Sequence, residues 1–176
     1  LPDPCSNEQY EAAMREALAG FARNGITHLA FGDLFLADIR AYRERNMAGT
    51  GITPLFPLWG LPTRPLLDEM LDAGLEAVIT CVDPRQVPAR WAGQRLGREL
   101  LGELPPGADP CGENGEYHTC VVNGPMFRRR LPVTTGEVVE RGGFVFADVL
   151  APSDAPGEIR PPLVEGHFTA KQKRVV

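Results

Sequence analysis

The segment DPCGENGEYHT, residues 109–119, places a thiol, carboxylates, glycines, an amide and an imidazole in one short run. Glu113 and Glu116 flank Asn114-Gly115, so either carboxylate could project from a loop into a cleft and act as a base or bind an ammonium group. The glycines allow a ligand to approach the backbone closely. An ordinary Asn-Gly turn at the mouth of a strand would place the same residues with no function, and spacing alone does not separate the two interpretations.

The same segment contains Cys111 and His118, which could act as a thiol nucleophile and its base. An isolated cysteine is more often a small apolar side chain, and no neighbour is an obvious partner to orient the imidazole. A zinc site built from Cys111, His118 and Cys120 has the wrong spacing for known frameworks, so we predict no metal ligands. The 4 cysteines include no C-x-x-C pair, which indicates reduced thiols.

A second candidate is Gly32-Asp33, just past the predicted carboxyl end of the strand ITHLAF, residues 26–31. Open α/β sheets bind ligands at that end of their strands, where an aspartate can accept from a ribose hydroxyl, hold a metal or orient an amine. Asp33 could instead cap the helix that follows, and spacing alone favours this simpler role. That helix carries charged residues that could meet phosphates or form an ordinary solvent face: Arg40, Arg43, Glu44 and Arg45.

Hydrophobic periodicity predicts the elements that position these residues. The first helix is expected over SNEQYEAAMREALAGFARNG, with Ser6 as N-cap, Gln9 completing a capping box and Asn24-Gly25 as the stop. Strands and helices then alternate: strand 26–31, helix 34–47, strand 52–59, helix 64–74 capped by Thr63, and strand 75–82. This alternation predicts parallel strands with helices on the faces of the sheet.

The pattern changes after Asp83-Pro84. A further helix is predicted within residues 93–104, a strand at 116–122 and an antiparallel hairpin around Gly142-Gly143. We therefore expect three parts. Residues 1–83 belong to the α/β domain, residues 84–151 form a smaller mixed α+β subdomain on the substrate side, and residues 152–176 form a proline-rich linker and tail.

Composition excludes several classes of function. The chain is 43% hydrophobic and 23% charged, which is typical of a globular protein. Its net charge of -5 gives no reason to expect a nucleic-acid partner. No apolar run is long enough for a membrane span or a signal peptide, so we expect a cytoplasmic protein.

The chain begins at Leu1 instead of methionine, which favours a piece of a longer protein. It contains no glycine-rich phosphate loop, so nucleotide binding does not follow from a motif.

Three segments together resemble the diphthine–ammonia ligase family of ATP pyrophosphatases, labelled adenine nucleotide alpha hydrolases in bacteria: GITHLAFGDLFLADIRAYRE, ITPLFPLWGLPTRPLLDEMLDAGLEAVITCVDP and DPCGENGEYHTCVVNGPMF. The similarity runs from about Pro4 to Leu150, and the chain looks like a bacterial-type member. It implies a Rossmann-like (HUP-type) nucleotide-binding domain, incomplete here at its N-terminal side, followed by a smaller domain. It also implies that ATP with Mg²⁺ adenylates a carboxylate and that ammonia displaces AMP, as in the last step of diphthamide synthesis on elongation factor two.

The resemblance implies roles for individual residues. The family's glycine-aspartate pair corresponds to Gly32-Asp33, and its helix arginine and glutamate correspond to Arg40 and Glu44. Its substrate-side block corresponds to a run in which Glu113 and Glu116 are expected to be catalytic and the others to bind substrate or nucleotide: Cys111, Gly112, Glu113, Asn114, Gly115, Glu116 and Tyr117. Asn114, His118 and Leu61 differ from the residues usual in the family.

From this resemblance we expect the carboxyl-terminal portion of an ATP-dependent amide ligase, which joins ammonia to a small-molecule or protein carboxylate. Because the phosphate loop is absent from the chain, we expect it to bind ATP weakly or not at all and to be inactive alone. Neither nucleic acid nor membrane is expected as a partner, and a homo-oligomer is compatible with the sequence. The competing hypotheses are a non-catalytic binding or regulatory module that kept the fold, and a thiol-dependent hydrolase that uses Cys111.

Overall fold

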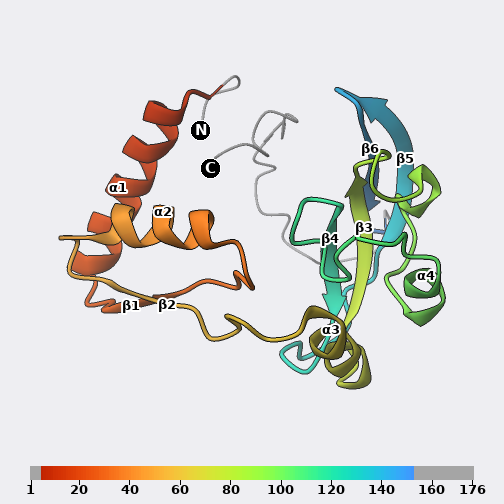
Figure 1. Ribbon diagram of the computed structural model, residues 1–176, viewed down its shortest axis with the longest axis horizontal. Helices are drawn as coiled ribbons and strands as arrows, with labels where there is room; N and C mark the ends of the chain where they lie inside the picture. The colour runs from red at the N-terminus through yellow and green to blue at the C-terminus, as the bar shows by residue number, and fades with distance from the viewer. Residues whose placement is uncertain (1–4, 153–176) are drawn as a thin grey trace. The chain divides into compact units, whose positions relative to one another are not determined.

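A computed structural model describes residues 5–152 of the chain (Figure 1). The described residues form two compact units that divide between Leu61 and Pro62. The predicted proline-rich linker and tail lie, except for residue 152, outside the described residues.

The first unit begins with α1 (Asn7–Arg23), which forms the predicted capping box. The Ser6 side chain accepts a hydrogen bond from the Gln9 backbone N–H, and the Gln9 side chain accepts one from the Ser6 backbone N–H. These bonds satisfy donors that a helix N-terminus otherwise leaves unpaired. The helix ends at Arg23 with Asn24 as its C-cap, and Gly25 follows with a φ of 79°, which favours glycine. Both ends of the predicted helix are confirmed.

A two-stranded parallel sheet pairs β1 (His28–Ala30) with β2 (Thr53–Leu55), and α2 (Ala37–Met47) connects them. Figure 1 shows α1 and α2 on the same side of these strands. The small apolar core between them is formed by Leu18, Met47 and Ile52. The predicted strand–helix–strand order with parallel pairing is confirmed, and Gly32-Asp33 lies just beyond the carboxyl end of β1.

The second unit contains a four-stranded antiparallel sheet in the order β4-β3-β6-β5. The strands are β3 (Glu76–Val82), β4 (Tyr117–Asn123), β5 (Thr134–Arg141) and β6 (Phe144–Leu150). β3 lies inside the sheet and pairs with β4 on one side and β6 on the other. β5 and β6 form the hairpin predicted around Gly142-Gly143.

Three helical segments pack on one face of this sheet: α3 (Thr63–Asp72), the short 3₁₀ helix η1 (Ala89–Trp91) and α4 (Arg98–Gly102). Apolar side chains from both layers form one core, which includes Leu67, Ala77, Ile79, Val82, Trp91, Leu101, Tyr117, Val145 and Ala147. Several of these side chains are fully buried. Burying a large apolar side chain contributes about 1.5–3 kcal/mol, so this core is the main source of stability in the unit.

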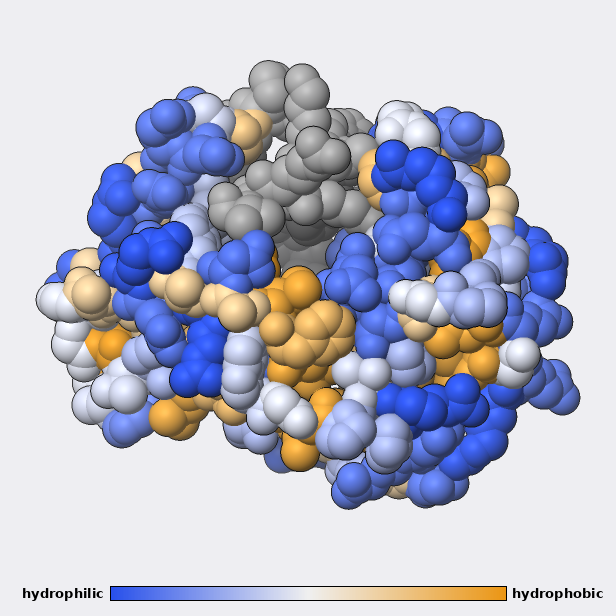
Figure 2. All heavy atoms as spheres, in the orientation of Figure 1, coloured by the Kyte–Doolittle hydropathy of each residue, from blue (hydrophilic) through white to orange (hydrophobic). Residues whose placement is uncertain are grey.

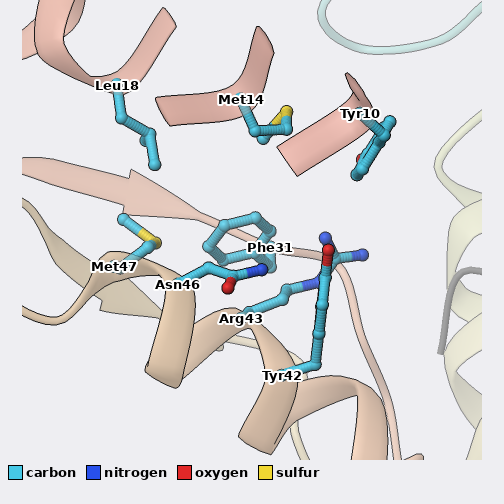
Figure 3. Close-up of a pocket in the computed structure, with 8 residues that line it drawn as sticks. All are labelled: Tyr10, Met14, Leu18, Phe31, Tyr42, Arg43, Asn46 and Met47. Carbon is cyan, nitrogen blue, oxygen red and sulfur yellow. The ribbon is translucent and has the colours of Figure 1, made fainter. Parts of the chain in front are cut away.

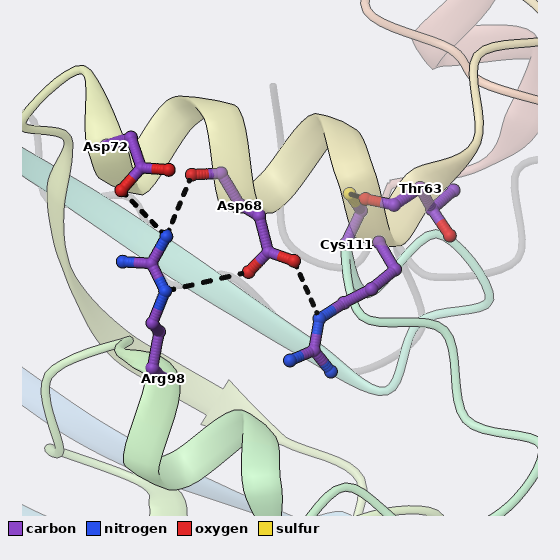
Figure 4. Close-up of polar contacts among 6 residues, drawn as sticks. Thr63, Asp68, Asp72, Arg98 and Cys111 are labelled. Carbon is purple, nitrogen blue, oxygen red and sulfur yellow. Dashed lines mark hydrogen bonds and ion pairs between the residues drawn. The ribbon is translucent and has the colours of Figure 1, made fainter.

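Polar contacts connect α3 with α4 and with the loop 109–117. Arg98 donates to the Asp72 carboxylate at 2.8 Å and lies 4.0 Å from the Asp68 carboxylate (Figure 4). The Cys111 thiol donates to the Thr63 carbonyl at 3.3 Å. This last contact holds the segment 109–117 against the first turn of α3.

Figure 2 shows a largely hydrophilic face on which apolar residues gather in a few patches. The most exposed large apolar side chain is Met126, at 70%, among the described residues. Exposed apolar side chains of this kind are ordinary in folded proteins. Within residues 5–152 we find no helix that combines the length and the apolar character needed to cross a membrane.

The structure differs from expectation at several points. β3 is antiparallel to its neighbours and not parallel as predicted. The reason is that it pairs with β4 and β6 of the second unit and does not join the parallel sheet of β1 and β2. The compact units divide at residues 61 and 62, whereas the pattern change in the sequence placed a boundary after residue 83. Thr63 is the first residue of α3, and the cap position belongs to Pro62 without a side-chain hydrogen bond. The architecture is mixed α/β, with a small parallel sheet and a separate antiparallel one.

Candidate functional site

The segment 109–117 is a turn-rich loop organised by Asp109. The Asp109 Oδ2 atom accepts hydrogen bonds from the backbone N–H groups of Cys111 and Glu113, each at 3.0 Å. The Asp109 carbonyl accepts a further bond from the Gly112 N–H, also at 3.0 Å. Aspartate side chains readily bond backbone groups a few residues ahead, so the residue types of the loop determine its shape.

Glu116 holds the loop from the inside. Its side chain is fully buried, and its Oε1 accepts from the Asp109 N–H at 2.7 Å and from the Asn114 side-chain amide at 3.1 Å. Its Oε2 is buried with no hydrogen-bond partner among the described residues. A hydrogen bond contributes about 0.5–1.5 kcal/mol, so these contacts give Glu116 a role in positioning the loop. Its catalytic role stays a prediction.

Glu113 differs from Glu116 in its accessibility. Glu113 is partly exposed, while Glu116 is fully buried. The Glu113 backbone is fixed by the Asp109 carboxylate, so the side chain projects from an ordered position. Of the two glutamates, only Glu113 can therefore meet an external ligand without opening the loop.

Two glycines allow the loop to turn tightly. Gly112 and Gly115 have φ angles of 72° and 80°, which side chains rarely tolerate. A Cβ at Gly112 would lie 2.9 Å from the Tyr117 carbonyl oxygen, whereas one at Gly115 would meet nothing within 4 Å. The Tyr117 hydroxyl donates to the Pro110 carbonyl and closes the loop on itself. Burial raises the pKa of Tyr117, so this hydroxyl keeps its proton at neutral pH.

Cys111 lacks the environment of a reactive thiol. Burial, with added repulsion from Asp109 and Glu113, raises the pKa of Cys111 to about 12. Because the nucleophile is the thiolate, a thiol with this pKa reacts poorly at neutral pH. The structure thus gives no support to the thiol-dependent hydrolase. All four cysteines are free of disulfide bonds.

An ion pair between a buried carboxylate, Asp83, and an exposed guanidinium, Arg85, adjoins the loop just after β3. The Asp83 N–H donates to the Glu116 carbonyl at 2.9 Å. The Arg85 guanidinium binds both oxygens of the Asp83 carboxylate, with Nε at 2.8 Å and Nη2 at 2.7 Å. Hydrogen bonding to Arg85 lowers the pKa of Asp83 to about 2, so the carboxylate is ionised at neutral pH. The sequence analysis did not single out either residue.

In the first unit Asp33 forms a two-point salt bridge with Arg43. The Nε and Nη2 atoms of Arg43 donate to the Asp33 carboxylate at 2.6 and 3.1 Å. The Arg43 guanidinium carbon lies 4.5 Å from the centre of the Phe31 ring, and Figure 3 shows the two side chains together. No side chain caps α2. The capping role considered for Asp33 is therefore wrong, and its carboxylate is occupied by Arg43.

A small cavity of about 20 Å³ lies beside this salt bridge, between α1 and α2. It is lined by side chains labelled in Figure 3, among them Met14, Phe31, Tyr42 and Asn46. The Tyr42 hydroxyl is buried without a hydrogen-bond partner among the described residues. A cavity of this volume holds one water molecule and is far too small for a nucleotide.

Arg40 forms the predicted pair with Glu44, with a distance of 2.8 Å from Nε to the carboxylate. Its guanidinium carbon also lies 4.7 Å from the centre of the Phe56 ring and 4.8 Å from that of Trp59. Phe56 directly follows β2. The contacts of Phe56 and Trp59 with Arg40 could not be predicted from the sequence, because ITPLFPLW, residues 52–59, is equally typical of a buried strand.

The structure groups the predicted site residues in two places. The loop contains Cys111, Gly112, Glu113, Asn114, Gly115, Glu116 and Tyr117. In the first unit Gly32 and Asp33 follow the carboxyl end of β1, and Arg40 and Glu44 lie on α2. The two groups belong to different compact units. Among residues 5–152 no three His, Cys, Asp or Glu side chains are grouped to hold a metal ion.

Comparison with known proteins decides the family. The model of the diphthamide synthase C-terminal domain matches residues 62–148, which begin where the second compact unit begins. A rat diphthine–ammonia ligase is 33% identical over 120 residues, which are 65% of this chain and 45% of that protein. The human diphthine–ammonia ligase is 32% identical over the same length and shares. The chain belongs to the diphthine–ammonia ligase family.

Within this family the chain is a partial match. A zebrafish diphthine–ammonia ligase is 33% identical over 120 residues, or 65% of this chain and 47% of that protein. The chain thus spans about half the length of the curated relatives it matches. The matched family domain contains the whole loop 109–117 and the Asp83–Arg85 pair. The candidate residues of the first unit lie outside the matched range.

Proposed function

We propose that this chain supplies the substrate side of an ATP-dependent amide ligase. In the proposed reaction a carboxylate and ATP give an acyl adenylate and pyrophosphate, and ammonia then displaces AMP to leave the amide. The names of the curated relatives and the family match over residues 62–148 support this class of reaction. The observation that carries the proposal is the preformed loop 109–117, which presents one partly exposed carboxylate, Glu113, from a backbone held by a buried Asp109.

Glu113 has the chemistry to handle ammonia. At neutral pH ammonia is mainly ammonium, and only the unprotonated form has a lone pair with which to attack an acyl adenylate. A carboxylate can accept hydrogen bonds from ammonium and take up a proton as the new C–N bond forms. Glu116 and Asp109 would act as positioning residues, because their carboxylates bind groups of the loop itself.

The nucleotide side of the proposed site involves Gly32, Asp33, Arg40 and Glu44, with ATP and Mg²⁺ as cofactors. Support comes from Gly32 and Asp33, which follow the carboxyl end of β1, and from Arg40, which contacts Phe56 just past the carboxyl end of β2. Open α/β sheets bind ligands at these ends. We propose that this pair is part of a Rossmann-like (HUP-type) sheet. The chain contains no phosphate loop, so we derive no step from its own residues to the nucleotide phosphates.

A domain exchange tests the proposal. Residues 62–148 replace the corresponding domain of the rat diphthine–ammonia ligase, and amide formation is measured on diphthine-bearing elongation factor two and on small carboxylates, with ATP and ammonium present. Ammonia-dependent amide formation that is lost in Glu113→Gln supports the ligase. A chimera that melts cooperatively and binds its carboxylate, yet releases no AMP with any substrate, would instead support the binding module.

A further inference from the structure

Arg40 lies in a corner formed by two aromatic rings. The ring planes of Phe56 and Trp59 are inclined by 72°, with centroids 6.2 Å apart. The Arg40 guanidinium carbon is nearly equidistant from the two centroids, at 4.7 and 4.8 Å. Cation–π contacts of this length stabilise an exposed guanidinium by about 0.5–1 kcal/mol each. The corner therefore holds the guanidinium in place before any ligand arrives.

Only part of the Arg40 donor set is used by the protein. The Nε–H donates to Glu44 Oε1 at 2.8 Å, and this is its one side-chain hydrogen bond within residues 5–152. A guanidinium has five N–H donors, so the Nη groups retain theirs. The Arg40 side chain is 36% exposed, which leaves it accessible to solvent.

The neighbouring arginine provides an internal comparison. Arg43 also lies over a ring, Phe31, but its fork is closed by both oxygens of Asp33. Arg40 has only a single-point contact with Glu44, an exposed pair of the kind that contributes about 0.3–0.5 kcal/mol. A ligand that binds the fork with two oxygens can compete with a contact this weak.

We propose that Arg40, fixed by Phe56 and Trp59, is a binding site for an oxyanion, either a phosphate or a carboxylate, held by two oxygen atoms. The two ligand classes share the acceptor geometry that a guanidinium fork recognises. For the identity of the anion this inference rests on the proposed function, which brings both a nucleotide phosphate and a substrate carboxylate to the ligase. The site lies past the carboxyl end of β2, where ligands of parallel sheets bind.

The site can be tested on the complete 176-residue chain by NMR. The chain has 2 tryptophans, Trp59 in the corner and Trp91 in the core, so two indole N–H signals report the site and a control. Phosphate, pyrophosphate and acetate are titrated separately at constant ionic strength, with chloride as the reference anion. We expect a saturable shift of the Trp59 signal with a dissociation constant of about 1 mM, while the Trp91 signal stays constant.

Three variants separate binding from structure. Arg40→Lys keeps the charge but removes the fork, and should weaken binding by about tenfold or more. Glu44→Gln removes the competing carboxylate, and should tighten binding by about twofold. Arg15→Lys is the matched control, because Arg15 pairs with Glu11 one turn away on α1, and should change nothing.

The anion that binds more tightly to the wild type identifies the source, phosphate for the nucleotide or acetate for the substrate carboxylate. Shifts equal to those with chloride, or equal affinities in wild type and Arg40→Lys, would overturn the inference. The titration needs no turnover, so it is independent of the proposed reaction. Arg40-dependent binding without ligase activity would count against the function alone, and ligase activity without such binding would count against the site alone.

Discussion

Replacing Glu116 tests whether the loop 109–117 is held from within. In Glu116→Ala the Asp109 N–H loses its acceptor, and a buried unpaired donor costs about 1–3 kcal/mol. The variant also leaves a cavity and removes the bond to the partly solvated Asn114 amide, so we expect a total loss of about 2–4 kcal/mol. Glu116→Gln keeps the accepting oxygen but puts amide N–H donors where Oε2 has no partner, so it should lose about 1–3 kcal/mol, less than Glu116→Ala.

Urea unfolding of the chain measures both losses, with midpoints compared at equal slope. Glu69→Ala is the control, because Glu69 is exposed on α3 and should stay within about 0.5 kcal/mol of wild type. Two results would refute the reasoning. A loss below about 0.5 kcal/mol in Glu116→Ala, the range of ordinary surface substitutions, would show that the buried contacts do not hold the loop. Equal losses in the Ala and Gln variants would show that the accepting oxygen is not what holds the loop.

Three further outcomes follow from the loop and its neighbours. The pKa of Cys111 is raised to about 12, so iodoacetamide at pH 7 should label this thiol far more slowly than a model thiol. Peptide mass spectrometry follows the labelling. Labelling at the rate of the model thiol would contradict the burial of Cys111. Gly112→Ala should destabilise the chain by about 2 kcal/mol or more, since its Cβ meets the Tyr117 carbonyl, while Gly115→Ala should cost about 1 kcal/mol; equal losses would contradict the geometry. The pKa of Asp83 is about 2 in the folded chain and about 3.9 when unfolded, so its pairing with Arg85 stabilises the fold above pH 4 and is lost as the pH falls from about 4 to 2. The loss should reach about 1–2 kcal/mol, because Arg85 is exposed to solvent, and it should be absent from the stability–pH profile of Asp83→Asn.

Elements with strong local signals could be predicted from the sequence. The capping box of Ser6 and Gln9 and the turn at Gly142-Gly143 depend on residues close together in the chain. The strand direction of β3 could not be predicted, because residues 76–82 are apolar on both faces and either pairing buries them. Its partner strands, β4 and β6, begin at Tyr117 and Phe144, far along the chain. The choice of partner therefore depends on tertiary packing and not on a local pattern.

In the candidate site, too, features with a local sequence signal could be predicted, and features that depend on the fold could not. Glu113 and Glu116 flank one Asn-Gly pair and look equivalent in sequence, and only the fold shows that one is partly exposed and the other buried. The contact between Asp83 and Glu116 joins the end of β3 to the loop, so no local pattern reveals it. An aspartate at the start of the turn, Asp109, had a recognisable local signal, because such side chains commonly bond the backbone that follows.

The central claim, that Glu113 serves the ammonia step of an amide ligase, is tested most directly by measuring the two half-reactions of Glu113→Gln in the rat chimera that carries residues 62–148. Pyrophosphate exchange reports adenylation, and amide formation at saturating ammonia reports the second step. The account predicts that exchange stays close to the level of the parent chimera while amide formation falls by roughly a hundredfold or more. Equal losses in both steps, with a lower melting temperature, would contradict it and leave Glu113 a residue that only holds the loop together.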